Sequence, residues 1–116
     1  YFEPLAIAFR RVVSILNDEA EGDIDPGLLS EPAEKKLFEA YLKVRDPVFR
    51  HIQNKEFSKA LEKIAEIKPA VDSFFDEVMV MVEDVSLRKN RLCLLQQISG
   101  LFSELADFSR IVLKKS

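Results

Sequence analysis

The sequence predicts an all-α fold, a bundle of about five helices that are mostly antiparallel. Apolar residues recur at spacings of three and four along most of the chain, which is the period of an amphipathic helix. After residue 30 the connections between these stretches are short, which favours antiparallel neighbours. With 116 residues the chain is long enough to bury a core as a single domain over residues 1–116.

The longest predicted helix covers residues 85–112, and Asp84 can cap its first turn. One face of this helix carries a stripe at alternating spacings of four and three. The stripe consists of Leu87, Arg91, Leu94, Ile98, Leu101, Leu105, Phe108 and Val112. Arg91 is the one charged member, so it either extends its head to solvent, pairs with Glu83 or Asp84, or serves a function.

Four further helices are expected before it. The first begins near Pro4 and ends at Asn17, with Arg10 and Arg11 off its apolar stripe and therefore exposed. An acidic surface loop over residues 18–30 follows, with Leu28 and Leu29 against the bundle. The second helix spans residues 32–52 and keeps its phase across Pro47, which indicates a kink.

The remaining boundaries rest on local signals. Ser30 is the expected N-cap of the second helix. Pro69 separates a third helix beginning at Phe57 from a fourth, and it should push Lys68 out of helical geometry. The fourth helix is predicted over residues 71–82, although residues 78–82 alone would also fit a strand.

The composition sets limits on function. The net charge is −3, but residues 1–34 hold eight acidic and two basic residues, so the remaining 82 residues carry a local balance of +3. No apolar run approaches the length of a membrane span, and no signal-peptide pattern opens the chain. The single cysteine favours a reducing, cytoplasmic setting. The first residue is Tyr1, so we expect a fragment of a longer protein.

The enzyme motifs that can be tested are absent from the sequence. The glycines are too far apart for a phosphate-binding loop, and one cysteine with one histidine cannot build a zinc site. We interpret Cys93 as a core or boundary residue and His51 as an ordinary exposed one. The acidic loop and the Asp72–Asp76 pair are weak metal candidates, and solvated surface is the preferred interpretation.

Four consecutive polar residues, Arg88, Lys89, Asn90 and Arg91, lie in the first turns of the long helix. Free N–H groups and the helix dipole already favour anions at that end. Three cations and an amide would make a phosphate or base contact there. The structural alternative is an arginine that pairs with nearby carboxylates.

Several motifs resemble a known family. Asp72-Ser73-Phe74-Phe75-Asp76-Glu77-Val78-Met79-Val80-Met81 is similar to its Asp-x-Phe-Phe-Asp-x-Val-Met-Val-Met. Residues 87–95 match Leu-Arg-x-Asn-Arg-Leu-x-Leu-Leu, and residues 106–109 match an Ala-Asp-Ile-Ser ending. Upstream, residues 10–16 match Lys-Arg-Val-x-Asn-Ile-Leu with Ser14 in place of Asn, and Glu31-Pro32 matches a Glu-Pro. This family is the C-terminal, DALR-type anticodon-binding domain of the bacterial-type glycyl-tRNA synthetase β subunit.

The resemblance implies a non-catalytic tRNA-binding domain of an aminoacyl-tRNA synthetase. The full ligase would join glycine to its tRNA with ATP and magnesium at the catalytic α subunit, so no cofactor is expected in this domain. The expected partners are the anticodon stem-loop of glycine tRNA, the rest of the β subunit and the α subunit, with no membrane. The expected tRNA contacts are Arg88, Lys89, Asn90 and Arg91, with Arg10 and Arg11 as a second phosphate contact. The alternative is a helical protein-interaction module, which exposed Met79 or Met81 would favour.

Overall fold

A computed structural model describes the backbone of residues 2–115 and the side chains of residues 3–107. Within them the helices are α1 (Phe2–Ile15), α2 (Pro32–Gln53), α3 (Phe57–Ala65), α4 (Lys68–Glu77) and α5 (Val85–Lys115), with a 3-10 turn, η1 (Pro26–Leu28). No strand occurs in residues 2–115. The predicted all-α fold is confirmed.

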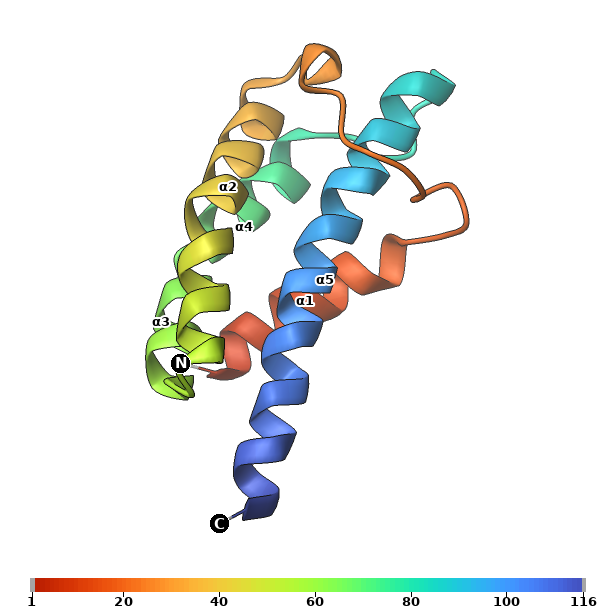
Figure 1. Cartoon of the computed structure of the whole chain (residues 1–116). Coiled ribbons are helices and arrows are strands. Elements are labelled where there is room, and N and C mark those ends of the chain that lie inside the picture. Colours follow the sequence, from red (N-terminus) through yellow and green to blue (C-terminus); the bar gives the residue numbers. More distant parts are fainter. Residues whose placement is uncertain (1, 116) are drawn as a thin grey trace.

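The helices form a small bundle in which α5 packs on α1, α2 and α3, and α4 packs on α2 and α1 (Figure 1). α4 runs antiparallel to both α2 and α5, whereas α2 and α5 run in the same general direction (Figure 1). α1 crosses α5 and also contacts α4. The loop of residues 16–31 leaves α1 and passes over the first half of α5 before α2 begins (Figure 1).

The apolar stripes predicted from the sequence meet in one core. The fully buried members include Leu5 and Val12 of α1, Leu37 and Val48 of α2, and Ile98 of α5. Residues 90–95 of α5 are all buried, so this part of the helix is covered on every side. The predicted stripe members Phe108 and Val112 lie outside the described side chains.

Two helix starts differ from the prediction. The N-cap of α2 is Glu31, with an extended backbone, and not Ser30. The Glu31 N–H donates to Oε1 of Glu34 at 3.2 Å, so a carboxylate inside the first turn satisfies the free amide. α4 starts at Lys68, one residue before Pro69, because a proline is tolerated in the first turn of a helix.

The predicted continuation of α4 through residue 82 is wrong. α4 ends at Glu77, and Val78 is extended. Val78 and Val80 are buried while Met79 and Met81 are exposed, which is the alternation of an extended chain. Residues 78–84 are therefore an irregular connection between α4 and α5. The sequence prediction missed it because the apolar residues of this segment also fit the helical period of α4. α2, by contrast, does continue through Pro47.

The acidic loop packs against the bundle as expected. Leu29 is 5% exposed and Ala20 is 8% exposed. Asp25 closes the turn at η1, since its carboxylate accepts the N–H of Gly27 at 2.9 Å. The loop is thus an ordered cover over the first half of α5.

Candidate nucleic-acid interface

The first predicted contact residue, Arg88, is bound to the acidic loop. Its Nε and Nη2 donate to the two carboxylate oxygens of Glu19 at 2.7 and 2.9 Å, and its Nη1 donates to the carbonyl of Val82 at 3.0 Å. The hydrogen bond from Arg88 lowers the pKa of Glu19, and the reciprocal bond raises the pKa of Arg88. The fork of the guanidinium is occupied by this bidentate pair.

Asn90 makes a two-way bond with the backbone of the same loop. Its Oδ1 accepts the N–H of Asp25 at 2.7 Å, and its Nδ2 donates to the carbonyl of Asp25 at 3.1 Å. The side chain is 4% exposed. An amide fits here because it carries a donor and an acceptor side by side.

Arg91 is buried, and its head does not extend to solvent. Its Nη2 donates to Oε1 of Glu34 at 2.9 Å, and its Nη1 donates to the carbonyl of Met79 at 2.6 Å. The arginine side chain is 5% exposed and that of Glu34 is 0% exposed. The expected partners Glu83 and Asp84 are not the ones used, because α2 supplies a carboxylate inside the core. Asp84 instead caps α5, as predicted, by accepting the N–H of Leu87.

Three of the four predicted residues therefore hold the protein together. In this conformation Asn90 and Arg91 have no side-chain surface to offer to an RNA, and Arg88 is engaged with Glu19. Lys89 remains exposed.

Arg10 and Arg11 are exposed on α1, as predicted. The guanidinium of Arg11 lies over the ring of Phe75, 4.5 Å from its centroid. Arg10 lines an apolar groove and is not engaged with Phe75. These two cations, unlike Arg88, keep surface that a phosphate could reach.

A basic surface on α2 was missed by the sequence prediction. α2 carries five cations against two exposed carboxylates, Glu39 and Asp46. The cations are Lys35, Lys36, Lys43, Arg45 and Arg50. The spacing of seven between Lys36, Lys43 and Arg50, which puts them on one face of a helix, was the signal available in the sequence.

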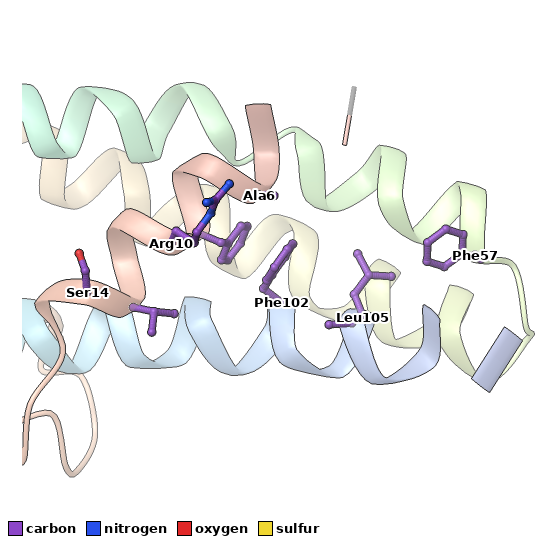
Figure 2. A pocket seen from close by; sticks show the side chains of 9 residues that line it. Ala6, Arg10, Ser14, Phe57, Phe102 and Leu105 are labelled. Atoms are coloured by element: carbon purple, nitrogen blue, oxygen red, sulfur yellow. The ribbon is translucent and has the colours of Figure 1, made fainter. Parts of the chain in front are cut away.

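Two hollows open on the surface of the described residues. The larger, of about 570 Å³, lies between α1, the start of α3 and the second half of α5. Phe102 and Leu105 of α5 project into it, with Arg10 and Ser14 toward one end and Phe57 at the other (Figure 2). Its wall is strongly apolar, and Phe102 stacks on Phe9 with centroids 3.7 Å apart.

The smaller hollow, of about 300 Å³, lies between α2 and α5. We call it the α2–α5 pocket; it is lined by Tyr41, Phe49, Gln96, Gln97, Gly100, Leu101 and Glu104. The Tyr41 hydroxyl donates to Oε1 of Gln97 at 3.2 Å. The guanidinium of Arg45 lies 5.8 Å from the centroid of the Tyr41 ring. This pocket joins aromatic, amide and carboxylate groups, with Arg45 over one of its aromatic rings.

Cys93 and His51, two further candidates from the sequence, both contact neighbouring groups of the chain. Cys93 is buried, burial raises the pKa of its thiol, and its Sγ lies 3.3 Å from the carbonyl of Glu21. His51 is half-buried rather than exposed. Its Nδ1 lies 3.1 Å from Oε1 of Glu56. Among the described residues no three His, Cys, Asp or Glu side chains gather as metal ligands would. None of the described helices has the length and apolar character needed to cross a membrane.

Comparison with known proteins decides the family. Residues 5–113 match the model of the DALR anticodon binding domain. The chain belongs to this family. The DALR match covers nearly the whole chain and supports anticodon binding over the alternative of a protein-interaction module, even though Met79 and Met81 are 71% and 51% exposed.

Relatives that are similar to this chain include β subunits of glycine–tRNA ligase. The β subunit from Geotalea daltonii is 44% identical over 110 residues, which is 95% of this chain and 16% of that protein. The β subunit from Myxococcus xanthus is 45% identical over 114 residues, again 95% of this chain and 16% of the relative. That from Acidobacterium capsulatum is 48% identical over 122 residues, with 96% and 17% covered. The chain thus spans about a sixth of the length of these relatives.

Proposed function

We propose that this chain binds the anticodon stem-loop of glycine tRNA as part of a glycine–tRNA ligase β subunit. The observation that carries the proposal is the DALR match over residues 5–113 together with relatives that include glycine–tRNA ligase β subunits from several organisms. In the full ligase, ATP and magnesium would act at a catalytic α subunit, and this domain would hold the far end of the tRNA in the cytoplasm. We propose residues 1–116 as one anticodon-binding domain.

The phosphate contacts are assigned to exposed cations. Arg10, Arg11 and Lys89 keep their place from the sequence prediction because their side chains reach the surface. The basic surface of α2 is a second candidate, since it gathers more exposed cations than α1. Each phosphate that a cation neutralises contributes about one unit to the salt dependence of binding.

The test is binding of the 116-residue chain to a fluorescently labelled glycine anticodon stem-loop at low salt. Anisotropy should show saturable binding that weakens as salt rises. Arg10→Ala with Arg11→Ala, and separately Lys43→Ala with Arg50→Ala, should reveal which surface holds phosphates through a salt slope smaller by roughly two. Lys59→Ala on α3 serves as the control.

Two results would contradict the proposal. A chain that is folded by circular dichroism but shows no binding at low salt would contradict anticodon binding. Equal affinity for the stem-loop and for an unrelated hairpin of the same length would show that the chain binds RNA without specificity for the anticodon.

A further inference from the structure

The second half of α5 offers an unusual row of three residues. Gln97, Gly100 and Glu104 lie three and four positions apart, and so on one face of the helix, and all three line the α2–α5 pocket. A glycine inside a helix destabilises it relative to alanine. A Cβ built at Gly100 would have no atom within 4 Å, so no neighbouring group requires a glycine there. Because Gly100 has no side chain, it leaves a gap between the amide of Gln97 and the carboxylate of Glu104.

The amide on one side of this gap has a fixed direction. Tyr41 is 5% exposed, and its hydroxyl donates to Oε1 of Gln97. The Nε2 group of Gln97 therefore keeps both of its N–H donors for a ligand. On the other side of the gap, Glu104 is exposed and offers acceptors only.

This pairing of groups fits one nucleobase. The pairing edge of cytosine presents an amino group that donates, beside a ring nitrogen and a carbonyl that accept. A carboxylate is a suitable acceptor for the amino group of cytosine, and an amide N–H can donate to its ring nitrogen or carbonyl. Uracil has a carbonyl in place of the amino group. That carbonyl and the carboxylate of Glu104 are both acceptors, so no hydrogen bond could form between them. Since glycine codons begin with two guanines, every glycine anticodon ends with two cytosines.

The opposite wall supplies the other requirements of a single-stranded base. Phe49 and Tyr41 both line the pocket, and the ring of Phe49, which is 38% exposed, gives an aromatic surface on which a base can stack. Arg45 of the same helix, whose guanidinium lies over the Tyr41 ring, can neutralise an adjoining phosphate. The larger apolar groove lacks this set, because its polar lining is limited to Arg10 and to Ser14, whose hydroxyl bonds the carbonyl of Arg11.

We propose that the α2–α5 pocket takes up one of the two anticodon cytosines, with Glu104 accepting from its amino group and Gln97 donating to its ring nitrogen or carbonyl. This rests on the proposed function and goes further, because it names the base and the residues that read it. Gln97 and Glu104 are then specificity-determining residues, and Gly100 gives the base room to enter.

The experiment measures binding of the 116-residue chain to three stem-loops by anisotropy. One carries both anticodon cytosines, and each of the other two has one of them replaced by uracil. The parent chain should bind the first loop about tenfold or more tightly than at least one uracil loop. Glu104→Gln should bring that ratio close to one, because an amide can donate to the uracil carbonyl or accept from the cytosine amino group.

Two further variants address the pocket itself. Gly100→Leu should weaken binding of every loop about tenfold or more, although it replaces a poor helix former by a good one. Ser103→Leu, on an exposed face of the same helix, is its matched control and should bind like the parent chain. Glu62→Gln on α3 removes the same charge as Glu104→Gln and should leave the preference for cytosine unchanged.

The outcomes separate this proposal from the proposed function. If the parent chain binds the cytosine loop but Glu104→Gln keeps the full preference, or Gly100→Leu keeps the full affinity, the pocket is not the base site and anticodon binding stands. A parent chain with no preference at either position also overturns the pocket proposal. Absence of any stem-loop binding overturns both.

Discussion

The guanidinium of Arg91 and the carboxylate of Glu34 form an ion pair removed from water, and the pair is only partly satisfied. Nε of Arg91 and Oε2 of Glu34 have no hydrogen-bond partner within the described residues. A buried pair of this kind contributes little net stability, but the loss of one partner leaves an uncompensated charge. The two side chains therefore have to be considered together.

Replacing Arg91 by methionine should lower the free energy of unfolding by about 3–5 kcal/mol, since Glu34 would stay buried without its partner. Urea titration followed by circular dichroism measures this. The double variant Glu34→Leu with Arg91→Met should recover part of the loss, because it removes the unpaired buried charge but also the carboxylate that accepts the Glu31 N–H. Arg45→Met, which breaks an exposed pair with Asp46, is the control and should cost less than about 1 kcal/mol. A loss of similar size in the control would show that burial is not the cause.

Glu56 gives a pH-dependent contribution to stability. Hydrogen bonds from Lys59 and then from His51 lower the pKa of its carboxyl from 4.5 to about 2. A lowered pKa in the folded state stabilises the protein above the unfolded value, and this contribution is lost as the pH falls from about 4.5 to about 2.

The corresponding variant is Glu56→Gln. The difference in melting temperature between the parent chain and this variant should be full at pH 6 and shrink toward zero near pH 2. Thermal melts at half-unit steps of pH measure the difference. If the difference stays constant over this range, the carboxylate does not titrate as the two hydrogen bonds require.

At the scale of elements, the segment of residues 78–84 shows how an extended chain can be fixed without a sheet. Val78 and Val80 enter the core, and the carbonyl of Met79 accepts from Arg91. Val80→Ala should lower the free energy of unfolding by about 2 kcal/mol, through lost burial and the space left behind. Met81→Ala should change it by less than about 0.5 kcal/mol. Equal losses in urea titrations would contradict the extended assignment.

The helices could be predicted from the sequence because their signal is local. The spacing of Leu37 and Val48 in α2, or of Leu94 and Ile98 in α5, reports the face that is buried. The partners of Arg88 and Arg91 could not be predicted, since Glu19 and Glu34 lie 69 and 57 residues away. No periodic signal in the sequence encodes such contacts. Arg88, Asn90 and Arg91, which were predicted to contact tRNA, instead bind other parts of the chain in this structure.

The prediction of a helix over residues 78–82 was wrong for a related reason. Over so few residues, alternating valine and methionine fits both a strand and one side of a helix. The helical period of the preceding residues was therefore extended too far along the sequence. The α2–α5 pocket was missed because Gln97 and Glu104 acquire meaning only when Tyr41 and Phe49 of another helix face them.

At the scale of the molecule, each of the helices α1 to α5 contributes buried apolar residues to one cluster. The molecule measures 48 × 24 × 24 Å, elongated because α5 extends beyond the other helices (Figure 1). A single shared core predicts one cooperative unfolding transition. Far-UV circular dichroism and tyrosine fluorescence, which senses the buried Tyr41, should give coincident urea transitions. Separated midpoints would show that part of the bundle unfolds on its own.

The tie between Asn90 and Asp25 has a consequence for how such sequences diverge. Asn90 binds only the main chain of Asp25, through one donor and one acceptor. Every residue other than proline offers the same two groups, so position 25 can change without loss of the tie, whereas position 90 cannot. We therefore expect related chains to keep the course of this loop while its side chains drift. A substitution at residue 90 would remove two hydrogen bonds to a segment that lies 65 residues away in the sequence.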